Sequence, residues 1–242
     1  MVEQHVPLVD AGLPVGVHGG FTTRAGGSGR APYDGLNLGD HVGDDPDVVA
    51  AHRDAVRRAV GATRLVVGEQ VHGADVVEVT IAPSTGTPRA DALVTSVRGL
   101  ALTVVVADCV PVLLADPAAG LVGVAHAGRP GLLAGVVPAV VAALRARGAT
   151  DITAVLGPSI CGGCYEVPQQ MADDVAERVP AARARTRWGT PAVDVAAGVL
   201  AQLHDLGVVA TSVGRCTYEH DDLFSYRRDG RTGRSGGVVV LR

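Results

Sequence analysis

The sequence predicts a layered domain of mixed helices and strands, of the α/β or α+β class, that spans all of residues 1–242. Three observations support this class. Short runs rich in Val, Ile and Leu, bounded by Gly, Pro or Asp, recur along the whole chain as strands do. Segments long enough for helices separate these runs. No shift in composition marks a linker, so a single domain is the simplest organisation.

Eight segments have the length and the β-branched composition of strands. They are RLVVGEQV (64–71), ADVVEVT (74–80), GLALTVVVA (99–107), PVLLA (111–115), GLVGVAH (120–126), ITAVLG (152–157), GVVATSVG (207–214) and GGVVVLR (236–242). They occur from one end of the chain to the other.

The clearest helix is DDPDVVAAHRDAVRRAV (44–60). Its Asp45 can cap the first turn, and Pro46 fits the first helical position because the missing N–H has no partner there. Further helices are expected at 131–147, 168–178 and 192–206. Pro138 should kink or restart the helix that contains it, since proline clashes with the preceding turn.

Charge and composition indicate a small-molecule partner. The chain has 21 Lys+Arg and 25 Asp+Glu, a net charge of −4, and no long run of like charge, which argues against a nucleic-acid partner. The start, MVEQHVPLVDAGLP, has no basic cluster before an apolar block and so does not resemble a secretory signal. The apolar region 120–144 contains His126, Arg129 and two prolines, which argues against a membrane span. We therefore expect a cytoplasmic protein.

Three side chains suit a catalytic metal site. His72, Cys109 and His126 each stand at or near the end of a predicted strand before a turn, where side chains project into sites. Two imidazoles and a thiolate suit zinc and leave its fourth position open. Their gaps of 37 and 17 residues match no compact zinc motif. A buried cysteine beside histidines that cap strands therefore stays open as an alternative.

Several motifs together resemble the YfiH family, long named multicopper polyphenol oxidase or laccase-domain proteins. The resemblance runs from about residue 18 to the end and rests on FTTRAGG, PYDGLNLGDHVGDDP, EQVHGADV, DALVT, ADCVPVLL, HAG, GPSICGGCYEV and LFSYRRDGRTGR. It implies a purine nucleoside phosphorylase for adenosine, inosine and S-methyl-5'-thioadenosine that also deaminates adenosine. It also implies a mixed β-sandwich flanked by helices, similar to the catalytic domain of cytotoxic necrotising factors.

The resemblance places the zinc ligands and the catalytic centre at His72, Cys109 and His126. The older oxidase name conflicts with the sequence, because multicopper oxidases hold copper with several His-x-His pairs and a His-Cys-His segment. None of the eight histidines forms such a pair, so we reject a full laccase site. Copper could still bind the same three ligands.

Phosphorolysis requires an anion pocket, for which arginine is the best residue. The candidates are Arg24, beside Gly26 and Gly27 in TTRAGG, then Arg129 and Arg227. The family pattern His-Ala-Gly-Trp-Arg-Gly reads HAGRPG here, so Arg129 takes the tryptophan position and a proline takes the arginine position. Arg129 must then reach the point that the family arginine occupies.

Other interpretations remain open. Cys109 could be the nucleophile and His126 the base of a cysteine hydrolase that cleaves amide bonds of cell-wall precursors, or the pocket could bind ligands without catalysis. Asp108 is expected to orient a neighbour rather than bind a metal. Cys161 and Cys164 form a Cys-x-x-Cys pair, but no second such pair exists, so we interpret them as part of a Gly-rich loop beside the pocket.

Overall fold

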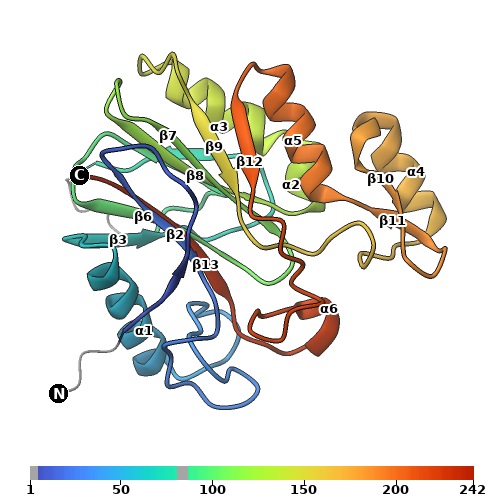
Figure 1. Ribbon diagram of the computed structural model, residues 1–242, viewed down its shortest axis with the longest axis horizontal. Helices are drawn as coiled ribbons and strands as arrows, with labels where there is room; N and C mark the ends of the chain where they lie inside the picture. The colour runs from blue at the N-terminus through green and yellow to red at the C-terminus, as the bar shows by residue number, and fades with distance from the viewer. Residues whose placement is uncertain (1–4, 81–86) are drawn as a thin grey trace.

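Two β-sheets stacked face to face form the centre of the protein, as seen in a computed structural model that describes residues 5–80 and 87–242 (Figure 1). The first sheet contains, in spatial order, β1 (Leu8–Val9), β2 (Val17–Thr22), β13 (Ser235–Leu241), β6 (Leu100–Val106) and β3 (Arg64–Val67). The second contains β12 (Val209–Ser212), β9 (Thr153–Leu156), β7 (Val110–Asp116), β8 (Leu121–Ala127), β5 (Ala92–Thr95) and β4 (Val76–Glu78). Each sheet mixes parallel and antiparallel neighbours.

Apolar side chains from both sheets fill the space between them. Phe21, Leu102 and Val239 of the first sheet share a buried cluster with Leu113 and Val124 of the second. Strands β6, β7, β8 and β13 are buried at every position. Strands covered on both faces are continuously apolar instead of alternating, which explains why the sequence shows these four strands so clearly.

Helices surround the sandwich, some over its outer faces and others at its edge (Figure 1). They are α1 (Pro46–Ala59), α2 (Arg129–Ala134), α3 (Val136–Arg145), α4 (Gln169–Arg178), α5 (Val195–Asp205), α6 (Tyr226–Asp229) and the 3₁₀ turn η1 (Pro180–Ala182). Helix α1 packs on the first sheet, and α2, α3 and α5 pack on the second, whereas α4 and α6 lie at the edge of the sandwich. Within the described ranges, no helix has both the length and the apolarity needed to span a membrane. The predicted mixed sandwich flanked by helices is thus confirmed, whereas its likeness to cytotoxic necrotising factors stays a prediction.

The predicted helices form, with two corrections. The side chain of Asp45 caps α1 by accepting a hydrogen bond from Asp47 N (2.9 Å), as the sequence indicated. The expected helix 192–206 begins only at Val195, because Pro191–Val193 form strand β11. The expected helix 131–147 is two helices, α2 and α3. The break lies at Gly135, whose φ of 85° is in the left-handed region, so Pro138 falls in the first turn of the new helix, where proline is tolerated.

Sequence reasoning missed five strands, β1, β2, β5, β10 (Arg183–Arg185) and β11, and misplaced the ends of others. Strand β2 contains Gly19 and Gly20 and therefore reads as a loop; a Cβ at Gly19 would lie 2.0 Å from Val238 O of the neighbouring strand. Strand β5 is short and was not expected. Strand β3 ends at Val67 and β6 ends at Val106, so the prediction that His72 and Cys109 end strands is wrong. His72 lies in the loop between β3 and β4, and Cys109 lies in the turn just before β7. The small hairpin of β10 and β11 lies beside α4.

Candidate metal centre and cavity

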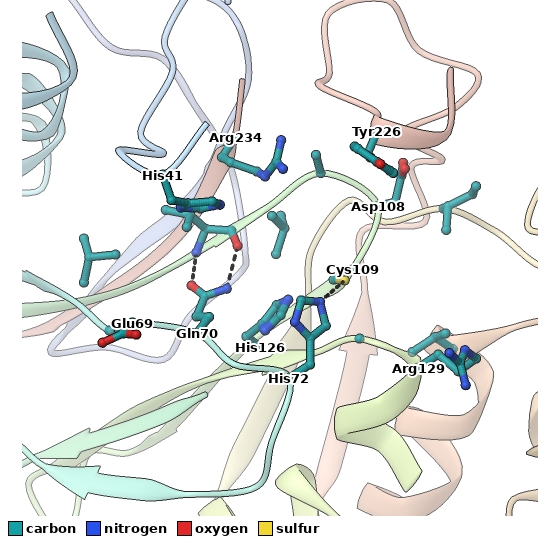
Figure 2. A pocket seen from close by; sticks show the side chains of 18 of the residues that line it. His41, Glu69, Gln70, His72, Asp108, Cys109, His126, Arg129, Tyr226 and Arg234 are labelled. Atoms are coloured by element: carbon teal, nitrogen blue, oxygen red, sulfur yellow. Dashed lines mark hydrogen bonds between the residues drawn. The ribbon is translucent and has the colours of Figure 1, made fainter. Parts of the chain in front are cut away.

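A cavity of about 750 Å³ opens where loops of both sheets meet (Figure 2). Its lining comes from the β3–β4 loop, the turn between β6 and β7, the end of β8, the start of α2 and the segment around α6. His72, Cys109 and His126 all line it, as the sequence indicated. Three side chains that are far apart in the sequence therefore line the same cavity.

These three residues form a compact ligand cluster. One nitrogen of each histidine and the Cys109 Sγ lie within 4.8 Å of one another. The His72 Nε2–Cys109 Sγ distance is 3.9 Å, and the rings of His72 and His126 meet edge to face with centroids 4.7 Å apart. His126 is buried, whereas His72 is exposed. The cluster thus has one anchored side and one side open to the cavity.

Asp91 organises the cluster, and only its place at the start of the motif DALVT marked it in the sequence. The residue is fully buried immediately before β5, and its backbone oxygen accepts a hydrogen bond from His126 N (2.7 Å). Its Oδ1 accepts a second one from His126 Nδ1 (2.8 Å). Because a carboxylate only accepts, His126 Nδ1 must donate, which leaves Nε2 as the nitrogen that can bind a metal.

Asp91 also fixes the loop that carries His72. Its carboxylate accepts hydrogen bonds from the backbone N of Val71 (3.1 Å), His72 (2.9 Å) and Gly73 (2.7 Å). His72 has a φ of 60°, an uncommon conformation for a residue with a side chain. These three hydrogen bonds stabilise that conformation, so one carboxylate positions both histidines.

Gln70 attaches the same loop to the first sheet. Its side-chain amide donates to Val105 O (2.8 Å) and accepts from Val105 N (2.7 Å) (Figure 2). The amide thereby pairs with the backbone of β6 two residues beyond Thr103, where the pairing with β3 ends. The motif EQVHG therefore combines an anchor, Gln70, with a candidate metal ligand, His72.

The thiol and the buried imidazole favour opposite charges. Burial alone would raise the pKa of Cys109, but the imidazoles of His126 and His72 outweigh it and lower the pKa to about 6. Burial alone would lower the pKa of His126, but the Cys109 thiolate and the Asp91 carboxylate raise it to about 9. Without a metal ion, the pair is a thiolate facing an imidazolium at neutral pH.

The cluster fits a metal ion in two respects. A carboxylate–histidine pair such as Asp91–His126 is the usual arrangement behind a metal-binding imidazole. Gly128 also leaves room, because a Cβ there would lie 2.8 Å from His72 Cδ2 and 2.9 Å from Cys109 Sγ. Two imidazoles and a thiolate are ligands that zinc prefers.

The predicted phosphate-binding arginines lie in different places. Arg129 begins α2 and Arg227 lies in α6, and both line the cavity. The Arg227 guanidinium lies over the ring of Tyr165 (5.0 Å). Arg24 is not part of the lining: its guanidinium pairs with Asp34 (3.1 Å) and Asp229 (2.7 Å). Two carboxylates already compensate its charge, so its role in phosphate binding stays a prediction that this placement does not favour.

Sequence reasoning missed Arg234, which lines the cavity near His41 and Tyr226 (Figure 2). Its Nη1 donates to the carbonyl oxygens of Thr232 (2.9 Å) and Gly233 (3.0 Å). In residues 5–80 and 87–242, no ion pair with an acidic side chain is recorded for it. Burial lowers the pKa of Arg234 below its usual value, although the charges of Cys109 and Asp108 act in the opposite direction.

Asp108 has the positioning role that the sequence suggested, although it lies in a turn and not in a strand. Its φ is 94°, and its carboxylate accepts hydrogen bonds from Thr217 Oγ1 (2.6 Å) and Arg227 N (2.6 Å). Asp108 therefore joins the turn that carries Cys109 to the C-terminal segment.

Comparison with known proteins gives the family. The family model described as multi-copper polyphenol oxidoreductase laccase matches residues 18–242. The chain belongs to this family. Among relatives of this laccase-like family, "Purine nucleoside phosphorylase SCO2081" of Streptomyces coelicolor is 55% identical over 93% of this chain and 96% of its own. "Purine nucleoside phosphorylase YfiH" of Shigella flexneri is 38% identical over 95% and 96%.

Solved structures of the laccase-like family share the fold. Neisseria meningitidis protein NMB0706 matches with a TM-score of 0.86 and 35% identity, over 98% of both chains. YlmD from Geobacillus stearothermophilus matches with a TM-score of 0.84 and 34% identity, over 94% of this chain and 93% of the other. The resemblance seen in the sequence motifs is therefore confirmed.

Proposed function

We propose that this protein is a zinc-dependent purine nucleoside phosphorylase that also deaminates adenosine. One observation carries the proposal: His72, Cys109 and His126 converge in an arginine-lined cavity, in a chain whose relatives are named purine nucleoside phosphorylases. The proposed substrates are adenosine, inosine and S-methyl-5'-thioadenosine, with inorganic phosphate as the second substrate.

The three ligands would hold one zinc ion, with copper as a competing ion. A zinc ion that keeps an open position supplies a Lewis acid for the activation of water or of a substrate oxygen. Asp91 would keep His126 in the tautomer whose Nε2 can bind the ion. Through its hydrogen bond with the backbone N of His72, it would also hold the second histidine in place.

Phosphorolysis places further demands on the cavity. A phosphate oxygen attacks C1′ of the ribose and the purine leaves, which gives the free base and ribose 1-phosphate. Arg234, Arg129 and Arg227 line the cavity and can neutralise the phosphate. Tyr165 and Tyr226 offer aromatic surface for the purine. Deamination instead consumes water and releases ammonia, so it needs none of the phosphate contacts.

The test is turnover of adenosine by metal-analysed protein, with and without phosphate. We expect adenine and ribose 1-phosphate only with phosphate, inosine in both cases, loss of all products on chelation and their return with zinc. His72→Ala and Cys109→Ala should lose both the metal and the activity. Full activity of metal-free protein would overturn the proposal. Inosine without adenine at any phosphate concentration would mean that Pro130 marks a branch without phosphorolysis.

A second candidate is a cysteine hydrolase that acts on amide bonds of cell-wall precursors. The observation in its favour is the order Cys109, His126, Asp91, which matches a nucleophile, a base and a group that orients the base. A zinc-bound thiolate is shielded, whereas a nucleophile is reachable. Iodoacetamide labelling separates the two: modification of Cys109 only after chelation supports the zinc enzyme, and inactivation without chelation supports the hydrolase.

A further inference from the structure

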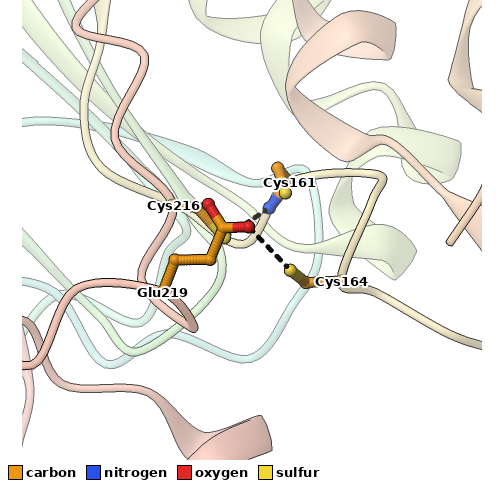
Figure 3. A group of neighbouring side chains, drawn as sticks. All are labelled: Cys161, Cys164, Cys216 and Glu219. Carbon is orange, nitrogen blue, oxygen red and sulfur yellow. Dashed lines mark hydrogen bonds between the residues drawn. The ribbon is translucent and has the colours of Figure 1, made fainter. Parts of the chain in front are cut away.

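A second group of metal-binding side chains lies outside the cavity cluster (Figure 3). The ligand atoms of Cys161, Cys164, Cys216 and Glu219 all lie within 4.8 Å of one another. None of the four lines the cavity. In the sequence, Cys161 and Cys164 have no second Cys-x-x-Cys pair beside them. The fold instead brings Cys216 and Glu219 to them, from a segment more than fifty residues away.

Two tight turns present these side chains. Cys161 O accepts a hydrogen bond from Cys164 N (2.9 Å), and Cys216 O accepts one from Glu219 N (3.2 Å). Each turn leaves two residues between its ligands, the spacing found in zinc ribbons and related structural zinc sites. The segments also lie side by side, because Ser159 and Cys216 form a parallel β-bridge. The backbone thus forms two facing chelating turns, of which one ends in a carboxylate.

The three thiols share one largely buried site, where burial and the neighbouring Cys216 and Cys164 raise the pKa of Cys161 to about 12, so a cation is needed to bring out its thiolate. Cys164 and Cys216 are buried, with 2% and 5% of their surface exposed, and Cys161 is partly buried. All three are free cysteines. Cys161 N donates to Cys216 Sγ (3.4 Å), an N–H···S contact that stabilises negative charge on the sulfur. Three thiols gathered in a chain with only four cysteines point to a shared partner.

A cation already contacts one edge of this cluster. The Arg187 guanidinium donates to Cys164 Sγ (2.6 Å) and to the Glu219 carboxylate. The same carboxylate accepts from Cys164 Sγ (3.6 Å). The cluster therefore attracts positive charge, and Glu219 keeps a second oxygen that Arg187 does not contact.

We propose that Cys161, Cys164, Cys216 and Glu219 bind one Zn²⁺ as a structural site, separate from the cavity cluster. Three thiolates and one carboxylate complete a four-coordinate shell without an open position, which is the arrangement of a structural site and not of a catalytic one. The sulfur-rich ligand set favours zinc over magnesium or calcium. Binding converts three thiols to thiolates, and their three protons go to the solvent.

This site would stabilise one wall of the cavity. The loop that holds Cys161 and Cys164 also carries Ile160 and Tyr165, which line the cavity. On the other segment, Thr217 follows Cys216 and donates to the carboxylate of Asp108, next to Cys109. A metal ion that joins the two segments would therefore fix residues on both sides of the proposed active site.

The test measures zinc and not activity, so its result does not depend on the proposed function. Two double variants each remove one cluster: His72→Ala with Cys109→Ala, and Cys164→Ser with Cys216→Ser. After reduction, zinc loading and removal of excess metal, wild-type protein should hold two zinc ions and each double variant one. Cobalt in the first variant should give a thiolate charge-transfer band several-fold stronger than in the second, because three sulfurs and not one contact the ion.

A matched pair of single variants tests the carboxylate. Glu219→Gln should weaken zinc binding at this site at least about tenfold. Glu166→Gln should leave it unchanged, because the Glu166 carboxylate contacts Trp188 Nε1 and not the thiols. If Cys164→Ser with Cys216→Ser does not fold, this pair and the cobalt spectra decide.

Three results would overturn the inference. They are absence of zinc from the reduced and zinc-loaded His72→Ala, Cys109→Ala protein, equal zinc affinity in the two glutamate variants, and a disulfide among Cys161, Cys164 and Cys216 that persists under the reducing conditions used for zinc loading.

Discussion

Replacement of Asp91 by Asn tests whether one carboxylate organises the metal centre. Its Oδ1 accepts from His126 Nδ1 and His72 N, and its Oδ2 accepts from Val71 N and Gly73 N. An asparagine has one acceptor oxygen, so either orientation turns an NH₂ group toward two donors. Two hydrogen bonds to a charged group are lost, at about 1.5–3 kcal/mol each. Asp91→Asn should therefore lower the free energy of unfolding of metal-free protein by about 3–6 kcal/mol.

Zinc affinity should fall as well, by about 10- to 100-fold, because the partner of a metal-binding histidine is lost. Denaturant unfolding measures the first effect, and competition with a chromophoric chelator measures the second. The control is Asp116→Asn, since Asp116 is equally buried but has no hydrogen bond to His72 or His126. Its carboxylate accepts from the backbone N of Ala119, Thr150 and Asp151. The control should be destabilised yet bind zinc normally; wild-type stability and affinity in Asp91→Asn, or equal loss of affinity in the control, would refute the reasoning.

Three further predictions concern the cavity. Iodoacetamide should alkylate Cys109 of metal-free protein with a midpoint near pH 6, because the thiolate forms as pH rises through its lowered pKa; a midpoint near pH 9 would contradict the ion pair. Gly128→Ala should lower the zinc affinity at least about tenfold, since the added Cβ would enter the ligand cluster. Gly73→Ala should leave the zinc affinity unchanged, because no atom lies nearer than 3.6 Å to a Cβ at that position. Arg234→Ala should impair phosphorolysis by about 10- to 150-fold, the loss of one charge-assisted contact, and affect deamination much less; a larger effect of Arg24→Ala would restore the role that the sequence suggested for Arg24.

Local chemistry explains what the sequence could determine. Asp45 caps α1 and Pro46 begins it because both effects act within one turn of helix. The central strands were visible because burial on both faces makes them continuously apolar. The sequence also indicated His72, Cys109 and His126 as candidate metal ligands, because each stands beside a break in an apolar run.

Only the tertiary structure decided how these residues meet. No short motif reveals the roles of Asp91, Arg234 and the Cys216–Glu219 turn, since a carboxylate that holds two histidines, an arginine that lines a cavity and a ligand pair are defined by groups far along the chain. Conversely, Arg24 stands in a Gly-rich motif that suggests anion binding, yet the fold brings Asp34 and Asp229 to it. The sequence determines which charged and metal-binding side chains are present. Whether a charge lies beside an opposite charge, a metal ion or a substrate depends on how the strands pair and how the two sheets and their loops pack, and no short stretch of sequence determines that.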